Sequence, residues 1–323
     1  MIAFVIILLS IGLNLGALSL QRRFRRVRWI ARRIGVVYWL IVVGLALGEG
    51  YFRFIDLSTD GRLASDRWMA RFWRENAFGY RDREWQPADW QGKSTVALLG
   101  DSVAAGWGIE NPADRFGDVL AAHLGAGYAL FNITQPGAHT LQSLANLRAH
   151  PASPVDVVIL QYFLDDIHYA LLRLGLPVPT AEIPLLARES FLANFLYSRN
   201  QVGFGADYWQ TYYAAYDNFA VWDVHRGELQ DLIAYVESID AALIVVIFPN
   251  MADPVASIPY VDRVAHVFEE GGHGDRVIKL FDAVAAWQTN TGESPILSER
   301  EAHPTTTFHH WLGNLLYEQF FRS

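Results

Sequence analysis

The sequence predicts an α/β domain with a parallel sheet, preceded by two apolar helices. Three observations carry this prediction. Short runs rich in Val, Ile and Leu recur at wide intervals after residue 92, segments with helical spacing lie between them, and the first fifty residues hold two uncharged stretches. Continuous apolar runs are typical of buried parallel strands, and their alternation with helices is typical of βαβ units.

The first fifty residues are predicted to form a transmembrane helical hairpin, residues 1–50. Ile2–Leu20 carries no charge, and Ile34–Gly48 is a second uncharged run that flanking aromatic residues extend. Residues 21–33, between the two runs, contain seven arginines. By the positive-inside rule this loop is cytoplasmic, which places everything after residue 50 on the other side of the membrane.

The charge of the chain divides at the same place. The 323 residues include 26 basic and 34 acidic side chains. Residues 1–49 contain seven arginines and one acid, Glu49, and so carry a charge of +6. Because the net charge of the whole chain is -8, the remaining residues carry -14. An acidic domain argues against nucleic acid as a partner, because nucleic-acid binding needs a basic surface.

A cleaved signal peptide followed by a basic helix is the alternative to the hairpin. Signal peptides carry positive charge before the apolar run and a small-residue cleavage site after it. Here no basic residue precedes the first run, and arginines follow it. The hairpin is therefore the favoured interpretation.

The main domain is expected to span residues 93–323. Its predicted strands are Thr95–Leu99, Tyr128–Ile133, Val155–Gln161, Leu243–Phe248 and Val277–Phe281. Helical spacing predicts helices that include residues 116–124 and 229–236, and residues 51–92 are expected to form a linker packed on the domain. Ligands of parallel sheets bind at the carboxyl ends of the strands, so the site is sought there.

Residues 167–225 interrupt the alternation and are predicted to form a cap insertion. Aromatic residues recur there at helical spacing: Trp209, Tyr212, Tyr213, Tyr216, Phe219 and Trp222. A cap helix buried against the sheet is the favoured interpretation. The alternative is a surface that contacts the bilayer or a partner helix.

Candidate catalytic residues follow the predicted strands. Ser102 comes directly after the first strand, between glycines, where its hydroxyl can be exposed and its amide aimed at an oxyanion. Gly137 follows the second strand, and an aspartate pair that starts at Asp165 follows the third. Near the C-terminus, His303 is the candidate base, and Glu301 is the nearest acid in sequence that can orient it.

Each of these residues also has a structural interpretation. Ser102 can be a helix N-cap, His303 a loop histidine, and the neighbouring aspartates can be caps. His303 together with His309 and His310 is weighed as a metal site and set aside, because no cluster of acidic or Cys ligands accompanies them. The chain has no cysteine, which excludes disulfides, thiolate sites and a cysteine nucleophile. No metal and no cofactor is expected.

Taken in order, these blocks resemble the SGNH (GDSL-type) hydrolase family. The blocks are Gly100-Asp101-Ser102, the stretch Asn132 to Gly137, Leu164-Asp165-Asp166, and His303-Pro304, with the lead-in Asn76 to Asp82 before them. The resemblance covers about residues 74–318 and is greatest to the bacterial membrane-tethered branch. It implies a flavodoxin-like three-layer α/β/α sandwich and hydrolysis or transfer of an ester-linked acyl group, often acetyl on carbohydrate. With the hairpin, it implies a protein of the bacterial inner membrane with two spans and a periplasmic domain.

The resemblance also implies roles for single residues. Ser102 would be the nucleophile, its amide and that of Gly137 would bind the oxyanion, and His303 would be the base. The family's orienting acid lies two or three residues before the histidine, where this chain offers Glu301 in place of aspartate.

Asp165 departs from the family, which has asparagine at this position of the oxyanion hole. An amide donates a hydrogen bond to the developing charge, whereas an ionised carboxylate only accepts one and repels the oxyanion. A missing oxyanion donor costs on the order of 10²–10³ in rate. Asp165 can donate if it is protonated, as a buried carboxyl beside Asp166 can be.

Two functions therefore stay open. The first is a membrane-anchored, extracytoplasmic serine esterase or acyltransferase, with the bilayer and an acylated carbohydrate as partners. The second is a catalytically weakened structural subunit of a larger membrane complex, such as a respiratory or photosynthetic assembly. Asp165 supports the second function, and so do the glycines of the two apolar helices, since small residues let transmembrane helices approach closely.

Overall fold

The protein consists of two compact units. The computed structural model describes residues 2–21, 23–178, 180, 182–200, 202–298 and 302–322. One unit, the helical unit, comprises residues 1–71 together with 181–202. The other, the sheet unit, comprises residues 72–180 and 203–323.

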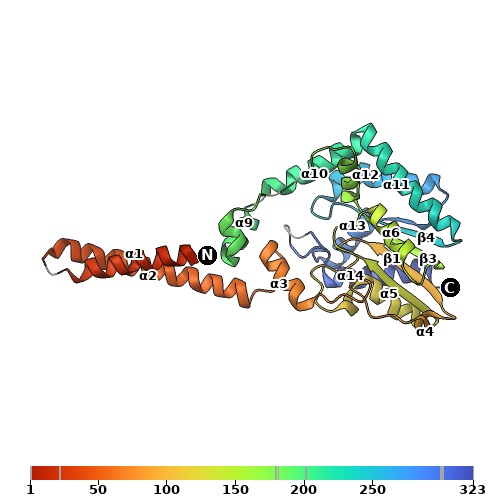
Figure 1. The fold of residues 1–323 in the computed structure, drawn as a ribbon. Helices are drawn as coiled ribbons and strands as arrows, with labels where there is room; N and C mark the ends of the chain where they lie inside the picture. Colours follow the sequence, from red (N-terminus) through yellow and green to blue (C-terminus); the bar gives the residue numbers. More distant parts are fainter. Residues whose placement is uncertain are drawn as a thin grey trace. The chain divides into compact units, whose positions relative to one another are not determined.

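The sheet unit is built on five parallel strands (Figure 1). They are β1 (Ser94–Gly100), β2 (Tyr128–Thr134), β3 (Val157–Phe163), β4 (Ala242–Phe248) and β5 (Val277–Lys279). Their order across the sheet is β2-β1-β3-β4-β5, the order of flavodoxin-type doubly wound sheets. All five strands lie at the runs that the sequence predicted, so the predicted α/β class with a parallel sheet is confirmed.

Helices cover both faces of this sheet. On one face pack α6 (Thr140–Ala149), α11 (Phe219–Ser238) and α12 (Pro254–Glu270). On the other face pack α5 (Phe116–Leu124), α13 (Leu280–Thr291) and α14 (Thr306–Phe320). Further elements of this unit are α10 (Val202–Asp217, from residue 203), the short helices α4 (Pro87–Trp90) and α7 (His168–Arg173), and the 3₁₀ turns η1 (Pro112–Asp114), η2 (Gly125–Gly127), η3 (Leu164–Ile167) and η4 (Gly274–Arg276).

Burial on two faces explains why the strands are apolar without alternation. Along β1, Ala97 and Leu99 belong to one core cluster, whereas Val96 and Leu98 belong to the other. All four are fully buried. Burying a Leu or Val side chain contributes about 1.5–3 kcal/mol to the stability of the fold. A polar side chain at any of these positions would therefore destabilise the folded state. Leu98→Ala would cost about 2–5 kcal/mol.

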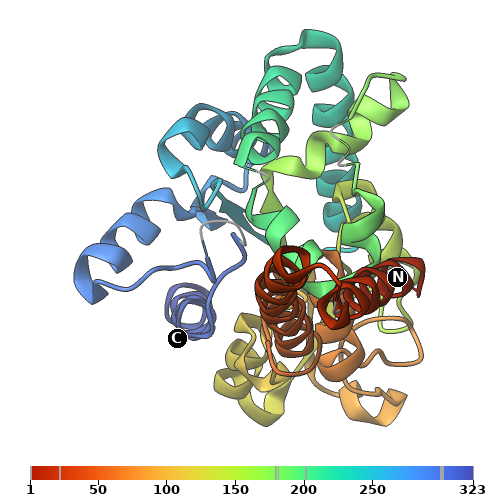
Figure 2. The ribbon, with the colours of Figure 1, turned by 90° about the vertical axis from the view of Figure 1, so that its left-hand side faces the viewer.

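The helical unit begins with α1 (Ile2–Leu20) and α2 (Arg25–Phe54), which lie side by side (Figures 1 and 2). Trp39 of α2 packs on Gly12 of α1, where an added Cβ would meet the indole at 2.5 Å. The Tyr38 hydroxyl donates a hydrogen bond to the Leu8 carbonyl. The two predicted helices therefore form and pair.

One helix of this pair is long and apolar enough to cross a membrane. Among the described residues, only the 30-residue α2 has that length and composition, and the apolar stretch Ile6–Leu20 of α1 is shorter. Side chains such as Leu40 and Leu47 are exposed on α2. A helix whose apolar side chains are exposed along its whole length is typical of a helix that lies in an apolar surrounding.

Part of the predicted cap belongs to the helical unit. There α3 (Arg62–Phe72, up to residue 71), α8 (Leu185–Glu189) and α9 (Phe191–Arg199) accompany the long helices. The Glu49 carboxylate accepts hydrogen bonds from Ser190 Oγ at 2.8 Å and from the Leu192 N–H at 3.0 Å at the start of α9. The Phe52 ring stacks on Phe195 with centroids 3.9 Å apart. An acid at a helix N-terminus satisfies free N–H groups and complements the helix dipole.

Candidate active site

Ser102 and His303 are in hydrogen-bond contact although 201 residues separate them. His303 Nε2 lies 2.8 Å from Ser102 Oγ. Ser102 follows β1, and His303 lies three residues before α14, whose first turn is capped by the Thr305 hydroxyl. A serine hydroxyl within hydrogen-bond reach of an imidazole nitrogen is the arrangement of an activated nucleophile and its base.

The turn that presents Ser102 is fixed from both sides. Gly100 has φ +157°, and a Cβ there would meet Gln161 Oε1 at 2.4 Å. The same Gln161 oxygen accepts the Asp101 N–H at 3.0 Å and the Ala104 N–H at 3.3 Å. The Gln161 side chain of β3 thus holds the backbone on both sides of the nucleophile, a role that was not predicted from the sequence.

The loop after Ser102 is held by the buried side chain of Arg81, from the lead-in segment. Its guanidinium donates to the carbonyls of Gly106 and Ile109, each at 2.7 Å. Arg81 is 1% exposed, and its burial and then the charge of Arg115 lower its pKa to about 10. A buried cation is tolerated when hydrogen bonds replace its water, so the carbonyls of this loop and Arg81 stabilise each other.

The backbone N–H groups of Ser102 and Gly137 are candidates for an oxyanion site. Within the described part of the chain, neither the Ser102 N–H nor the Gly137 N–H donates to another residue. Gly137 has φ +74° in the turn after β2, and no atom lies within 4 Å of the position a Cβ would take. Backbone N–H groups that have no acceptor are suited to bind an oxyanion.

Asp165 belongs to a cluster of three carboxyl groups at the end of β3. One oxygen each from Asp101, Asp165 and Asp166 lies within 4.8 Å of the other two. The Tyr208 hydroxyl donates to Asp165 Oδ2 at 2.7 Å, and the Thr140 hydroxyl donates to Asp166 Oδ2 at 2.9 Å. Asp101 and Asp166 are buried, whereas Asp165 keeps part of its surface exposed.

These three acids hold protons more tightly than free aspartate does. Burial, and next the charge of Asp165, raises the pKa of Asp101 to about 7. Burial, and next the charge of Asp101, raises the pKa of Asp166 well above its usual value. Burial also raises the pKa of Asp165, although the hydrogen bond from Tyr208 opposes it. Three negative charges so close together are unfavourable, because like charges destabilise each other where water is excluded.

The acid trio is also the group that could hold a cation. Among the described residues it is the one set of three or more metal-ligating side chains that converges. Carboxylate oxygens suit hard cations such as Mg²⁺ or Ca²⁺. However, Tyr208 and Thr140 already donate to two of the oxygens, and the Val103 N–H donates to Asp101 Oδ1 at 2.7 Å. This pattern fits carboxyl groups that share protons.

The other histidines do not join His303. His309 is buried and accepts the Phe116 N–H at 3.2 Å, and burial lowers its pKa to about 3. His310 Nε2 lies 2.8 Å from Asp114 Oδ1 at the surface. Glu301 lies outside the described residues, so its part in orienting His303 stays a prediction.

Helix α10 brings a residue to the site that sequence reasoning missed. Tyr208 immediately precedes the predicted aromatic series, four residues before Tyr212 and eight before Tyr216, and this helical spacing was the available signal. Tyr212 and Tyr216 are buried, as the cap-helix interpretation predicted, whereas Phe219 is 79% exposed.

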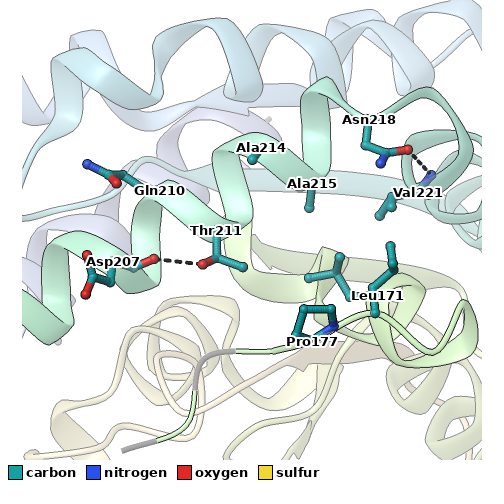
Figure 3. Close-up of a pocket in the computed structure, with 10 residues that line it drawn as sticks. Leu171, Pro177, Asp207, Gln210, Thr211, Ala214, Ala215, Asn218 and Val221 are labelled. Atoms are coloured by element: carbon teal, nitrogen blue, oxygen red, sulfur yellow. Dashed lines mark hydrogen bonds between the residues drawn. The ribbon is translucent and has the colours of Figure 1, made fainter.

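A different face of α10 lines a pocket of about 520 Å³ (Figure 3). Asp207 and Thr211 face that pocket with Leu171 and Pro177 opposite, and no candidate catalytic side chain lines it.

Comparisons with known proteins find similarity to solved structures at low sequence identity. No protein-family model matches the sequence, and no curated protein matches it. A member of the lipolytic G-D-S-L protein family from Veillonella parvula is similar in structure, at 13% identity and TM-score 0.44, over 71% of this chain and 100% of its own. The esterase EstA of a Pseudoalteromonas species (15% identity, TM-score 0.43) is similar over 70% of this chain and 96% of its own. Phospholipase A1 from Streptomyces albidoflavus (17% identity, TM-score 0.44) is similar over 70% and 99%.

Proposed function

We propose that the protein is a membrane-anchored, extracytoplasmic serine hydrolase or acyltransferase of the SGNH type. One observation carries the proposal: the 2.8 Å contact between Ser102 Oγ and His303 Nε2. It lies at the carboxyl edge of a parallel sheet, where folds of this class bind their ligands. The substrate class is an acyl ester, with O-acetyl carbohydrate as the leading example.

The site residues divide the reaction between them. His303 accepts the Ser102 proton as Oγ attacks the acyl carbonyl, and the N–H groups of Ser102 and Gly137 bind the resulting oxyanion. His303 then gives the proton to the departing alcohol oxygen, which leaves an acyl-serine. Water or a sugar hydroxyl attacks this ester with His303 again as base, and Glu301 orients the imidazole.

The membrane location is proposed from the N-terminal residues. The apolar α2 supplies one membrane-length helix, and the arginines of residues 21–33 mark the cytoplasmic side. With α1 as the second span, the sheet unit lies in the periplasm of a bacterium, at the inner membrane. The acidic charge of the chain after residue 49 suits that side, because it faces away from the anionic cytoplasmic leaflet.

A second function, a structural subunit of a membrane assembly, is favoured by two observations. Asp165 places a carboxyl where the resembled family has an amide donor. Gly16, Gly35 and Gly44 have no atom within 4 Å of their Cβ positions, so these parts of α1 and α2 leave room for a further helix.

The test is hydrolysis of a short-chain aryl ester by the full-length protein in detergent, beside a Ser102→Ala control. We expect turnover that the control lacks and a phosphonate label on Ser102. An absence of Ser102-dependent turnover on aryl esters and on acetylated carbohydrate would contradict the enzyme. Native purification tests the subunit function, which a free monomer would contradict.

A further inference from the structure

We propose that Asp165 works as a neutral carboxylic acid that donates a hydrogen bond to the oxyanion, and that Tyr208 of α10 fixes its orientation. This inference rests on the proposed function and deepens it. It names the third oxyanion donor, the residue that positions this donor, and the condition under which the donor works.

The first step is the place of Asp165. Strands β1 and β3 are paired neighbours, so their carboxyl ends meet at one edge of the sheet. Ser102 and Asp101 follow β1, and Asp165 follows β3 in η3. The 4.8 Å limit on the Asp101 and Asp165 oxygens puts the Asp165 carboxyl beside the turn that carries the nucleophile.

The second step is the charge around it. Titratable groups from several elements interact electrostatically or by hydrogen bonds with Asp165 or with the acids beside it. The acids are Asp101 after β1, Asp166 of η3 and Glu228 of α11, and the histidines are His168 of α7 and His303 before α14. The tyrosines are Tyr162 of β3 and Tyr208, Tyr212 and Tyr216 of α10. Burial is the largest influence on each of the three acids and raises the pKa of all of them. His168 and His303 oppose this at Asp165 without reversing it.

The third step is the direction of the proton. Because the Tyr208 hydroxyl donates to Oδ2 at 2.7 Å, that oxygen is an acceptor and the acid proton belongs on Oδ1. A carboxylic acid held in this way presents one acceptor and one donor on the same planar group. This is the pattern of an asparagine side chain, so Oδ1–H can take the role that the resembled family gives to the amide N–H.

The fourth step is the rigidity of Tyr208. Its ring meets Tyr212 edge-on with centroids 4.6 Å apart, and the Tyr212 hydroxyl is hydrogen-bonded to His168 Nδ1 at 2.6 Å. The Tyr216 hydroxyl donates to the Leu164 carbonyl at 3.0 Å and so ties η3 to the same helix. Three tyrosines of one helix therefore hold Asp165 and the turn that carries it. Tyr208 is a positioning residue, since it acts through Asp165.

The inference fixes how activity depends on pH. A donor that must keep its proton fails as pH rises through its pKa, so native activity should fall at alkaline pH. Asp165→Asn has a donor that does not titrate, so this alkaline loss should disappear. Tyr208→Phe removes the hydrogen bond that lowers the pKa of Asp165. Its alkaline loss should therefore move to higher pH, while its turnover falls at every pH because the acid is no longer oriented.

The experiment is a profile of kcat/KM against pH for the native protein, Asp165→Asn and Tyr208→Phe, with the rate of Ser102→Ala subtracted. Tyr213→Phe is the matched control, since Tyr213 lies on the same helix but bonds Asn250 at 3.1 Å. At the alkaline end we expect Asp165→Asn to exceed the native protein by on the order of 10²-fold, the worth of one oxyanion donor. Tyr213→Phe should follow the native profile.

Infrared difference spectroscopy supplies a readout that needs no turnover. At pH 7 the spectrum of the native protein minus that of Asp165→Asn should show the carbonyl band of a protonated carboxyl. If this band is absent from the difference spectrum, the inference is overturned. Three kinetic results also overturn it: an unchanged profile in Asp165→Asn, activity that only Asp165→Asn shows, or activity that a chelator removes and Mg²⁺ or Ca²⁺ restores. If no variant turns over an ester, the proposed function fails, and the infrared band still decides the state of Asp165.

Discussion

Strands β1 and β3 end side by side but supply the site with different kinds of group. After β1, the nucleophile turn is fixed by Gln161 and by the buried Arg81, and Ser102 already contacts His303. After β3, Asp165 sits among acids whose state depends on protons. The backbone of the β1 turn is held by the uncharged Gln161 amide and by the Arg81 cation, although its Asp101 belongs to the acid cluster. The end of β3 places Asp165 and Asp166 in that cluster, so its charge changes with pH. One edge of the sheet therefore combines a turn whose backbone is held in place with acids whose protonation changes with pH.

Removing the nucleophile should have the largest effect on this comparison. Ser102→Ala should lower kcat by on the order of 10³-fold or more, because the covalent route is lost. The measurement is aryl-ester turnover, with Ser238→Ala at the exposed end of α11 as the control. Residual activity near the native level would show that the β1 end is not the reacting end.

Removing the clamp on the β1 side should cost stability. Arg81→Met leaves the carbonyls of Gly106 and Ile109 without their donor, and a buried acceptor left unsatisfied costs about 1–3 kcal/mol. Urea unfolding of the variant checks this value. The control is Arg83→Met, whose guanidinium lies exposed over the Trp85 ring. Equal losses in both variants would contradict a special role for Arg81.

On the β3 side, the native protein should lose stability as pH rises. Because the folded protein raises the pKa of Asp165, its contribution is fully present below the unfolded value near 3.8 and is lost as pH rises through the folded value. Each unit of difference is worth about 1.4 kcal/mol. Urea midpoints from pH 4 to pH 8 should therefore fall less in Asp165→Asn than in the native protein. Asp275→Asn, at an exposed position, should keep the native slope, and parallel slopes in all three proteins would argue against a raised pKa.

The smallest effect on the site should come from the helical unit. Glu49→Gln weakens the contacts at the start of α9 by about 0.5–2 kcal/mol. Hydrogen exchange should rise in residues 190–194, while kcat/KM and its pH profile stay native. A shifted pH profile would show that the difference between the β1 and β3 ends is not a property of the sheet unit alone.

The sequence predicted those features that a short stretch of chain determines. The five strands follow from local apolar runs, and Ser102, Gly137 and Asp165 follow from their places directly after strands. Arg81, Gln161 and Tyr208 were not predicted, because each acts through a pairing distant in sequence. Arg81 reaches carbonyls 25 and 28 residues away, and Tyr208 reaches an acid 43 residues away. Neither composition nor periodicity records such pairings.

The place of α8 and α9 was beyond prediction for the same reason. Their sequence is apolar and helical, which fits a cap on the sheet equally well. What assigns them to the helical unit is Glu49, which bonds Ser190 across 141 residues. A single acid at the end of an apolar helix gave no indication of a partner so far along the chain.

The division into two units has a consequence for any soluble form of this protein. The chain passes from one unit to the other three times, at residues 71–72, 180–181 and 202–203. A protease that cuts only the first crossing breaks the covalent link between the long helices and the rest of the chain. The fragment that starts at residue 72 still carries α8 and α9. Those helices would then expose Leu192 and Phe195, which had packed on Gly48 and Phe52. Release of the sheet unit without exposed apolar helices therefore requires removal of residues 181–202 as well. A single cleavage at the first crossing does not achieve this.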